Sequence, residues 1–364
     1  MRIAICTPDL APGDAVSNDV IGMYQAFREK DFEARIFAAN AYVQTPAIFP
    51  PERIQRFIRN RRDILVYHHS VGWDLGLELH RKLKCRKVVK YHNVTPAEFF
   101  KGIAENYCAA CTAGRQQLSA LCRVKTDLYL ADSDYNLREI IDSGTNGAHC
   151  GIVPPFHHID RLRGITADAE IIHRFNDKYV NFLMVGRVVP NKNYEDLIQT
   201  FYIYHRQYNP RSRLLIVGKE DAGLASYSMS LRAKIRHLNL EGDVLFTGSV
   251  PDAALKAYYQ VADVFVITSK HEGFCVPLVE AMSMRIPIVA YGTSAIPGTV
   301  DKVGLVWNEQ DPALLAASVN QIVENDHVRR SLGEMGWRRY QQQFTNARIK
   351  ERLFREFRMA NLLT

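Results

Sequence analysis

Short β-rich segments alternate with longer amphipathic segments along the chain, and this alternation constrains the fold more than any other feature of the sequence. In the first half the β-rich segments are IAICTP, ARIFAAN, DILVYHH, KVVKYHN, LYLADSD and CGIVPPF. Helical patterns such as NDVIGMYQAFREK and LGLELHRKLK lie between them. Strands that alternate with helices indicate a parallel sheet covered by helices on both faces.

The same alternation starts again after residues 155–175. The second set of β-rich segments is NFLMVGR, SRLLIVGK, DVLFTGSV, DVFVITS, IPIVAYG and GLVWN. A chain of 364 residues also exceeds the usual size of a single core. We therefore predict two doubly wound α/β domains, residues 1–160 and 170–344, with a ligand cleft between them. The final amphipathic segment, about residues 345–364, could cap the second domain or pack back on the first.

Composition narrows the class of protein. Apolar residues make up 47% of the chain and charged residues 23%, which is typical of a globular protein. No apolar stretch approaches the roughly 20 residues that span a bilayer, so we expect a cytoplasmic location. The seven cysteines are scattered and odd in number, which favours reduced thiols. Cys108 and Cys111 form a CxxC that fits either a helix face or half of a metal site.

The net charge of +7 is concentrated in the first half of the chain. Its densest stretches are RFIRNRR at 56–62 and RKLKCRKVVK at 81–90. One interpretation is a solvated face. The other is attraction to an anionic membrane surface or a phosphorylated partner. No nucleic-acid partner is expected, because no recognition motif accompanies the charge.

The segment HEGFCVPLVEAM carries two carboxylates, Glu272 and Glu280, on either side of an apolar turn. It follows the predicted strand DVFVITS, so Glu272 should lie in the loop beyond the strand and Glu280 about one turn into a helix. Carboxylates near a helix start are common, because the helix dipole stabilises them. A carboxylate can also accept hydrogen bonds from vicinal hydroxyls, and a helix amino terminus attracts phosphate. The segment fits either a plain helix start or a site for a phosphorylated sugar.

A second loop, in VGRVVPNKNYEDL, favours the binding site. Arg187 and Lys192 follow the first predicted strand of the second domain, with Gly186 at the turn and Asn193 as a possible helix cap. A guanidinium and an ammonium beside a strand end can clamp a diphosphate, although basic loop residues are usually only solvated. Two such loops in one domain predict a nucleotide-sugar site.

These motifs resemble the family 4 retaining glycosyltransferases with the GT-B fold, among them bacterial envelope-polysaccharide enzymes. The resemblance rests on VGR-x4-K, FTGSVP, E-G-F-x-x-P-x-x-E-A-M and Y-G-T-S-A-I-P, in that order, over most of residues 180–308. In the first half, YHNVTP, ADSDYN and VPPF match more loosely. The resemblance implies two Rossmann-like domains that face each other across a cleft. It also implies that the terminal helix packs back on the first domain.

The resemblance also implies a role for each matching residue. Arg187 and Lys192 would hold the donor diphosphate, Glu272 would face the transferred sugar, and Glu280 would bind the ribose hydroxyls. His92 would approach the donor sugar, so the catalytic set is Glu272, His92, Arg187 and Lys192. The remaining donor contacts implied are Gly13 near the diphosphate, Gly218 and Val250 at the nucleotide, and the backbone of Gly273, Phe274, Cys275 and Val276.

Two departures from the family pattern affect this assignment. The loop around Gly13 reads APGDAVSN, where relatives often have paired glycines, and Gly298 follows YGTSAIP, where many relatives have an acid. Neither change removes a residue assigned to the chemistry.

Other polar residues in the first half leave alternatives open. Asp132-Ser133-Asp134 has the spacing of a metal-dependent diphosphate site, but Arg187 and Lys192 already supply positive charge, so we expect no metal and no cofactor. His68 and His69 end a strand, where they fit either the acceptor side of the cleft or strand-end packing.

The favoured function is transfer of a hexose, with mannose preferred, from a nucleoside diphosphate sugar to a hydroxyl of a glycan or lipid-linked glycan. The resemblance implies retention of anomeric configuration without a metal, in the synthesis of a lipopolysaccharide, O-antigen or capsule-type polysaccharide. Peripheral contact with an anionic membrane would fit the basic first domain. A nucleotide-sugar epimerase or phosphorylase is the alternative enzyme, and a non-catalytic sugar-nucleotide-binding partner is the alternative outside catalysis.

Overall fold

The computed structural model describes residues 1–43, 46–145 and 147–363, which form two compact units. Unit 1 comprises residues 1–98, 106–158 and 345–364, and unit 2 comprises residues 99–105 and 159–344. Unit 1 is thus assembled from both the first and the last segments of the chain. Residues 99–105 belong to unit 2, although they lie within the predicted first domain.

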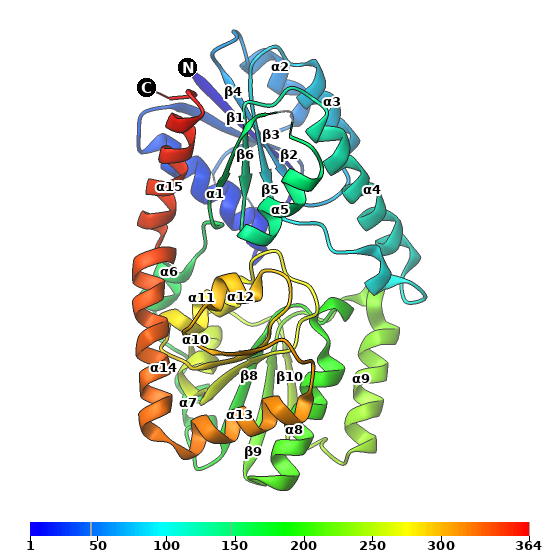
Figure 1. The fold of residues 1–364 in the computed structure, drawn as a ribbon, viewed down its shortest axis with the longest axis vertical. Coiled ribbons are helices and arrows are strands. Elements are labelled where there is room, and N and C mark those ends of the chain that lie inside the picture. The colour runs from blue at the N-terminus through cyan, green and yellow to red at the C-terminus, as the bar shows by residue number, and fades with distance from the viewer. Residues whose placement is uncertain (44–45, 146, 364) are drawn as a thin grey trace. The chain divides into compact units, whose positions relative to one another are not determined.

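In the described part of unit 1, seven parallel strands form one sheet in the order β3-β2-β1-β4-β5-β6-β7 (Figure 1). The strands are β1 (Arg2–Leu10), β2 (Glu33–Ala41), β3 (Ile48–Phe49), β4 (Ile64–His69), β5 (Arg86–Tyr91), β6 (Leu128–Ala131) and β7 (His149–Ile152). The central strands are buried on both faces, as the runs of β-branched and aliphatic residues predict. The short edge strand β3 was not predicted.

Helices cover the two faces of this sheet. Ile3 and Ile5 of β1 face a core shared with α1 (Ala15–Arg28) and α15 (Asn346–Met359), whereas Ala4 and Cys6 face the opposite core. On the α15 side, the ring of Phe27 packs 5.2 Å from that of Phe357. The helices on the other face are α2 (Ile54–Phe57), α3 (Asp74–Lys82), α4 (Glu105–Cys122) and α5 (Asp134–Asp142).

In the described residues of unit 2, six parallel strands form a sheet in the order β10-β9-β8-β11-β12-β13. The strands are β8 (Val180–Val185), β9 (Ser212–Val217), β10 (Val244–Gly248), β11 (Val264–Ile267), β12 (Ile288–Tyr291) and β13 (Leu305–Trp307). Every strand predicted for the second half is present. The order reverses between β8 and β11, which is the topological switch point where doubly wound sheets bind their ligands.

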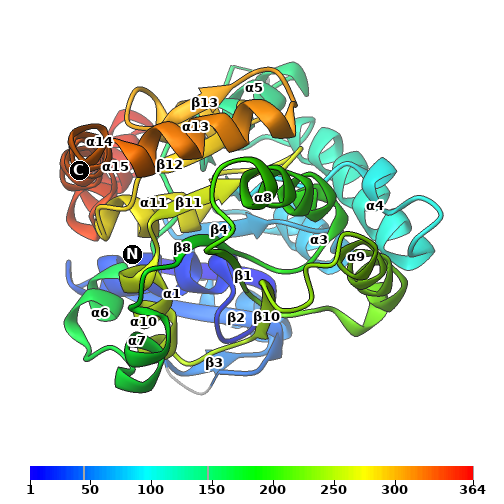
Figure 2. The ribbon, with the colours of Figure 1, turned by 90° about the horizontal axis from the view of Figure 1, so that it is seen from below.

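Helices flank this second sheet as well. Figure 2 shows α8 (Tyr194–Gln207) and α13 (Pro312–Glu324) together on one side and α10 (Asp252–Val261) on the other. The remaining helices are α6 (Ile159–Gly164), α7 (Ala169–Phe175), α9 (Ala225–His237), α11 (Val276–Ser283), α12 (Ile296–Val300) and α14 (Asp326–Arg339).

Two further predictions concern cysteines and membranes. All seven cysteines are free thiols, as expected, and Cys108 and Cys111 lie on α4. Among the described residues, no helix is both long enough and apolar enough to cross a membrane.

Candidate active site

The loops that follow β8 and β11 meet at the switch point of unit 2. Lys192 comes from the first loop and Glu272 from the second, and their Nζ and Oε1 atoms lie 2.5 Å apart. Their side chains are 14% and 8% exposed, so water screens the pair little. Burial by itself would lower the pKa of Lys192, but the Glu272 carboxylate outweighs it and the pKa is raised. Lys192 is therefore a fixed positive charge at the switch point.

Hydrogen bonds to backbone carbonyls hold these two loops together. The side-chain amide of Asn191 donates to the His271 carbonyl at 3.0 Å, and the backbone N–H of Lys270 donates to the Asn191 carbonyl at 2.8 Å. The Thr268 hydroxyl donates to the Asn193 carbonyl at 2.9 Å. Asn193 adopts a left-handed backbone with φ of 54°, which asparagine tolerates better than most residues. The Lys192–Glu272 pair is thus positioned by the backbone rather than by its own attraction alone.

Arg187 lies in the first loop and is exposed, in contrast to Lys192. The structure shows no hydrogen bond or ion pair from its guanidinium to any described residue. A guanidinium beside a buried ammonium presents two different donors to an anion, one forked and exposed, the other compact and held by Glu272.

Glycines occupy the ends of three adjacent strands in unit 2. Gly186, Gly218 and Gly248 follow or end β8, β9 and β10, and all have positive φ. The Gly186 N–H donates to the Val217 carbonyl, and the Gly218 N–H donates to the Gly248 carbonyl. A Cβ built on Gly218 would lie 1.9 Å from the Gly186 carbonyl oxygen. Gly218 therefore permits the close approach of two backbones beside the Arg187 loop.

We expect Gly218→Ala to distort this loop and to destabilise unit 2. Positive φ penalises any L residue by about 1–2 kcal/mol, and at Gly218 the clash with Gly186 adds to that cost. Gly248→Ala is the matched control, because its φ is also positive at 70° but its Cβ would meet nothing within 4 Å. Chemical denaturation and the donor KM compare the two variants, and equal effects would refute a role for close approach.

The turn between Glu272 and Glu280 is apolar and tightly held. Cys275 precedes α11 with a left-handed φ of 73° and is buried, as is Phe274. The Thr299 hydroxyl donates to the Phe274 carbonyl at 2.9 Å, and Ser294 accepts a hydrogen bond from the Glu272 N–H at 2.7 Å. The apolar residues thus anchor the loop that presents the Glu272 carboxylate.

Glu280 lies on α11, as predicted, and is only 4% exposed. The hydroxyl of Tyr259 on α10 donates to its Oε2 at 2.5 Å. Burial and the Glu280 carboxylate both raise the pKa of Tyr259. One carboxylate oxygen is therefore oriented by Tyr259, and binding of ribose by Glu280 stays a prediction. Val250 is half-buried, just after β10.

His92 follows β5 in unit 1 and lies in a buried polar network. Its Nδ1 is 2.9 Å from Asp132 Oδ2, and its Nε2 is 2.8 Å from His68 Nδ1. Lys90 is fully buried, with its Nζ 2.5 Å from Asp132 Oδ1 and in contact with the Val153 carbonyl. The imidazole of His92 is thus fixed on both of its nitrogens.

Asp19 on α1 completes this network. Its Oδ1 accepts a hydrogen bond from the Phe156 N–H at 2.7 Å, whereas its Oδ2 is buried without a hydrogen-bond partner, 3.6 Å from His92 Nε2. Burial raises the pKa of Asp19, although Lys90 and His92 act against it. Burial by itself would also raise the pKa of Asp132, but the interactions with His92 and Lys90 outweigh burial, and the pKa of Asp132 is lowered.

The spacing of Asp19, His68 and His92 is also compatible with a metal ion, because their ligand atoms lie within 4.8 Å of one another. Lys90, however, places an ammonium 3.9 Å from Asp19 Oδ2, so positive charge is already supplied there. The donor set therefore fits a hydrogen-bonded charge network better than a cation site.

The Asp132-Ser133-Asp134 motif does not direct both carboxylates to one point. Ser133 caps α5 by accepting from the Asn136 N–H, and the exposed Asp134 pairs with Arg138 one helical turn away. Only Asp132 joins the His92 network. His69 is buried and bonded to the Gly114 carbonyl at 3.0 Å, which is strand-end packing, whereas its neighbour His68 lies in the network.

Gly13 lies in the loop after β1, with φ of 74°, and a Cβ added there would meet no atom within 4 Å.

Sequence reasoning missed Asp19, Lys90 and Asn191. Lys90 carried a signal, because it is a charged residue inside the otherwise apolar strand KVVKYHN. Asp19 carried none, since an acid near the start of a helix is ordinarily exposed.

Comparison with known proteins shows a resemblance in unit 2. Residues 167–339 match the family model for glycosyl transferases group 1, and they include Arg187, Lys192, Glu272 and Glu280. The chain is 27% identical over 192 residues to amylovoran biosynthesis glycosyltransferase AmsD of Erwinia amylovora, covering 51% of this chain and 49% of that protein. It is 29% identical over 151 residues to O-antigen chain mannosyltransferase B of Escherichia coli, covering 40% and 38%. The alignments thus span about half or less of these relatives' own lengths.

The fold is shared more widely than the sequence. A solved structure of Anabaena HepE in complex with UDP matches with a TM-score of 0.78 at 17% identity, covering 99% of this chain and 100% of that one. Two parallel-sheet α/β units of this kind match GT-B glycosyltransferase structures. Residues 167–339 therefore match the family model for glycosyl transferases group 1, and the two α/β units have the fold of the GT-B glycosyltransferase structures.

Proposed function

We propose that the chain transfers a hexose from a nucleoside diphosphate sugar to a hydroxyl of a glycan acceptor, with retention of the anomeric configuration. The observation that carries this proposal is the Lys192–Glu272 pair at the β8/β11 switch point, with the exposed Arg187 beside it. A diphosphate needs fixed positive charge, and a sugar needs an acceptor of hydroxyl hydrogen bonds. The loop after β8 supplies the positive charge, and the loop after β11 supplies the acceptor of hydroxyl hydrogen bonds.

In this mechanism the bond between the sugar C1 and the diphosphate oxygen breaks while a bond between C1 and the acceptor oxygen forms. Negative charge grows on the departing diphosphate, so groups that stabilise it should account for most of the rate enhancement. Lys192 supplies preorganised charge, and Arg187 closes on the diphosphate from solvent. The acceptor proton passes to the leaving phosphate oxygen on the same face, which accounts for retention without a metal. Glu272 orients the sugar by accepting hydrogen bonds from the sugar hydroxyls.

The relatives suggest the class of product. The names of AmsD and O-antigen chain mannosyltransferase B place those two proteins in polysaccharide synthesis. We propose a similar polysaccharide acceptor for this chain, lipid-linked at the cytoplasmic face of the membrane. Mannose is the favoured sugar because of the mannosyltransferase relative. The UDP bound to HepE favours a uridine nucleotide instead, so the donor must be tested directly.

The decisive experiment incubates the purified protein with a panel of GDP- and UDP-hexoses, with and without a polysaccharide acceptor, and follows nucleoside diphosphate release. Release that depends on acceptor, persists in excess EDTA and falls in Glu272→Gln supports the proposal. Turnover of a nucleotide sugar without acceptor would favour the epimerase, and turnover with phosphate alone would favour the phosphorylase. Binding without any turnover would favour the non-catalytic partner.

A further inference from the structure

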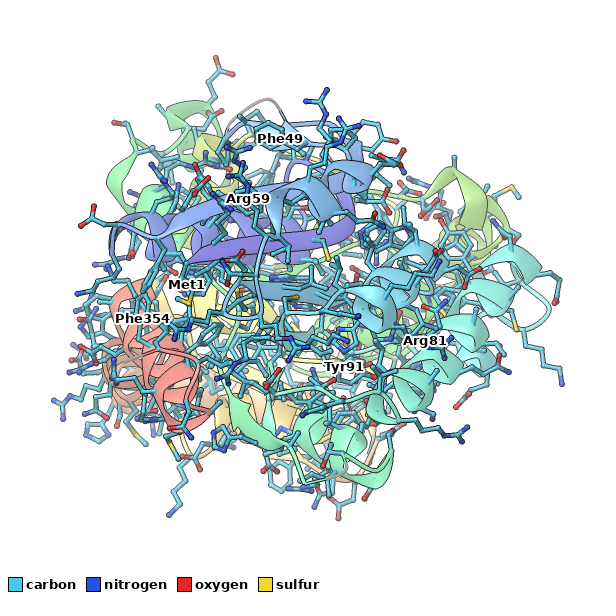
Figure 3. The ribbon with its side chains drawn as sticks, turned by 90° about the horizontal axis from the view of Figure 1, so that it is seen from above. Met1, Phe49, Arg59, Arg81, Tyr91 and Phe354 are labelled. Atoms are coloured by element: carbon cyan, nitrogen blue, oxygen red, sulfur yellow. The ribbon has the colours of Figure 1, made fainter. Side chains whose placement is uncertain are left out.

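We infer that unit 1 contains a second anion site, at the amino-terminal edge of its sheet, that binds a phosphate-bearing group. A hollow of about 250 Å³ opens there, between the first residues of β1 and β2 and the segment 51–59. Five arginines line it: Arg2, Arg35, Arg53, Arg56 and Arg59. Figure 3 views this end of the unit, with Phe49 and Arg59 labelled at neighbouring positions.

The strands supply a fixed part of this arginine hollow. Arg2 and Arg35 both pair with Glu33, at 2.9 and 3.6 Å, and Glu33 is the one acidic residue lining the hollow. The Arg35 guanidinium also lies over two aromatic rings, 5.2 Å from the centre of Phe49 and 4.7 Å from that of Phe57. Cation–π contacts and the ion pair restrict these side chains before any ligand arrives.

The segment 51–59 supplies the other three arginines of the hollow. Arg53 caps α2, Arg56 lies one helical turn further within it, and Arg59 follows the end of the helix; all three line the hollow. Within the chain that the structure describes, none of the three guanidiniums has a carboxylate partner. Among the described residues that line the hollow, Glu33 is the one carboxylate facing five guanidiniums, and nearby Asp63 accepts hydrogen bonds from the Arg2 and Arg59 backbone N–H groups. The guanidiniums repel one another unless an anion lies among them.

The chemistry of the hollow specifies the ligand. Guanidinium forks match phosphate oxygens in pairs, and arginine clusters are the usual means of recognising phosphorylated groups. A divalent phosphate would neutralise much of the excess charge, and the Phe49 and Phe57 rings offer an apolar floor for the group that carries it. The hollow lies at the opposite end of β1 from Gly13, roughly 25 Å away at 3.3 Å per residue, and at the opposite edge of the sheet from His92, which follows β5.

The test uses a matched pair of double variants. Arg53→Gln/Arg56→Gln removes two charges from the hollow, and Arg61→Gln/Arg62→Gln removes two charges from the same basic stretch but outside the hollow. Both are made in an Arg187→Ala background, which weakens the proposed donor clamp, and are compared with Arg187→Ala alone, so that any phosphate binding that remains at Lys192 is the same in all three proteins. Pyrophosphate affinity is measured by titration calorimetry, and binding to phosphatidylglycerol vesicles, against phosphatidylcholine vesicles, by co-sedimentation.

We expect the first double variant to lose roughly tenfold or more in affinity, as loss of charge-assisted hydrogen bonds predicts, and the second to lose little. If only the first double variant loses affinity for pyrophosphate, the ligand is a free phosphate compound. If only the first double variant loses affinity for the vesicles, and pyrophosphate binding is unchanged, the ligand is a lipid headgroup. Equal losses in both variants, or no binding of either probe, would overturn the site. Glycosyl transfer to a soluble acceptor is measured alongside with Arg187 intact and should not change, so this test stands apart from that of the reaction.

Discussion

Lys192→Ala is expected to lower kcat about 100- to 1,000-fold, the usual cost of removing one preorganised charge from a transition state. The Nζ of Lys192 is the buried positive group at the switch point, and Arg187 cannot take its place because it is exposed and water screens its charge. Arg187→Ala should therefore cost less. Acceptor-dependent release of nucleoside diphosphate measures both variants.

A loss of stability has to be separated from this loss of catalysis. Lys192→Ala leaves Glu272 buried without its partner, which destabilises the fold by itself. The double variant Lys192→Ala/Glu272→Gln removes that unpaired charge and should regain stability in thermal unfolding, yet its turnover should stay well below that of Glu272→Gln alone. If the two proteins turned over equally fast, Lys192 would be a structural residue and the clamp assignment would fail.

Asp132→Asn is expected to destabilise unit 1 by about 3–5 kcal/mol, the range for removing one partner of a buried ion pair. Lys90 is fully buried 2.5 Å from Asp132, and the substitution leaves its ammonium with only the more distant carboxylate of Asp19. Asp134→Asn is the matched control from the same motif, since Asp134 is exposed and should cost less than about 1 kcal/mol. Urea denaturation of the two variants measures the difference.

A second variant separates the roles of Asp132 in folding and in positioning His92. Lys90→Met/Asp132→Asn replaces the buried pair by neutral groups and should restore most of the stability. Activity that stays low in this stable protein would show that Asp132 positions His92. Equal loss of activity in Asp132→Asn and Asp134→Asn, together with inhibition by EDTA, would instead support a metal bound by the motif.

Much of the fold could be predicted because its signals are local. Every described strand from IAICTP to GLVWN except β3 was marked by a short apolar run between polar turns, and the helices by their periodicity. Strand β3 was not predicted because its two residues, Ile48 and Phe49, are too few to show an alternating pattern. The pairing of β8 with β11 is not local, since β9 and β10 lie between them in the sequence.

The candidate site was predictable for a related reason. Arg187, Lys192 and Glu272 were found because each follows a recognisable strand, and parallel strands end at one edge of a sheet. That Lys192 and Glu272 form an ion pair could not be read from residues 80 positions apart. The His92 network was harder to predict, because its members are far apart in the sequence: Asp19 lies on α1, His68 on β4, Lys90 on β5 and Asp132 just after β6. Each looks ordinary in its own segment, and only the folded unit buries them together.

The return of α15 to unit 1 has a consequence for synthesis of the protein. Phe354 and Phe357 cover the same core as Phe27, yet the whole of residues 159–344 separates α15 from the rest of unit 1. A chain emerging from the ribosome therefore completes unit 2 while one apolar face of unit 1 is still uncovered. Exposed apolar surface of that kind promotes aggregation during folding. The amino-terminal half of this protein is made first, but its core cannot be completed until α15 has been synthesised.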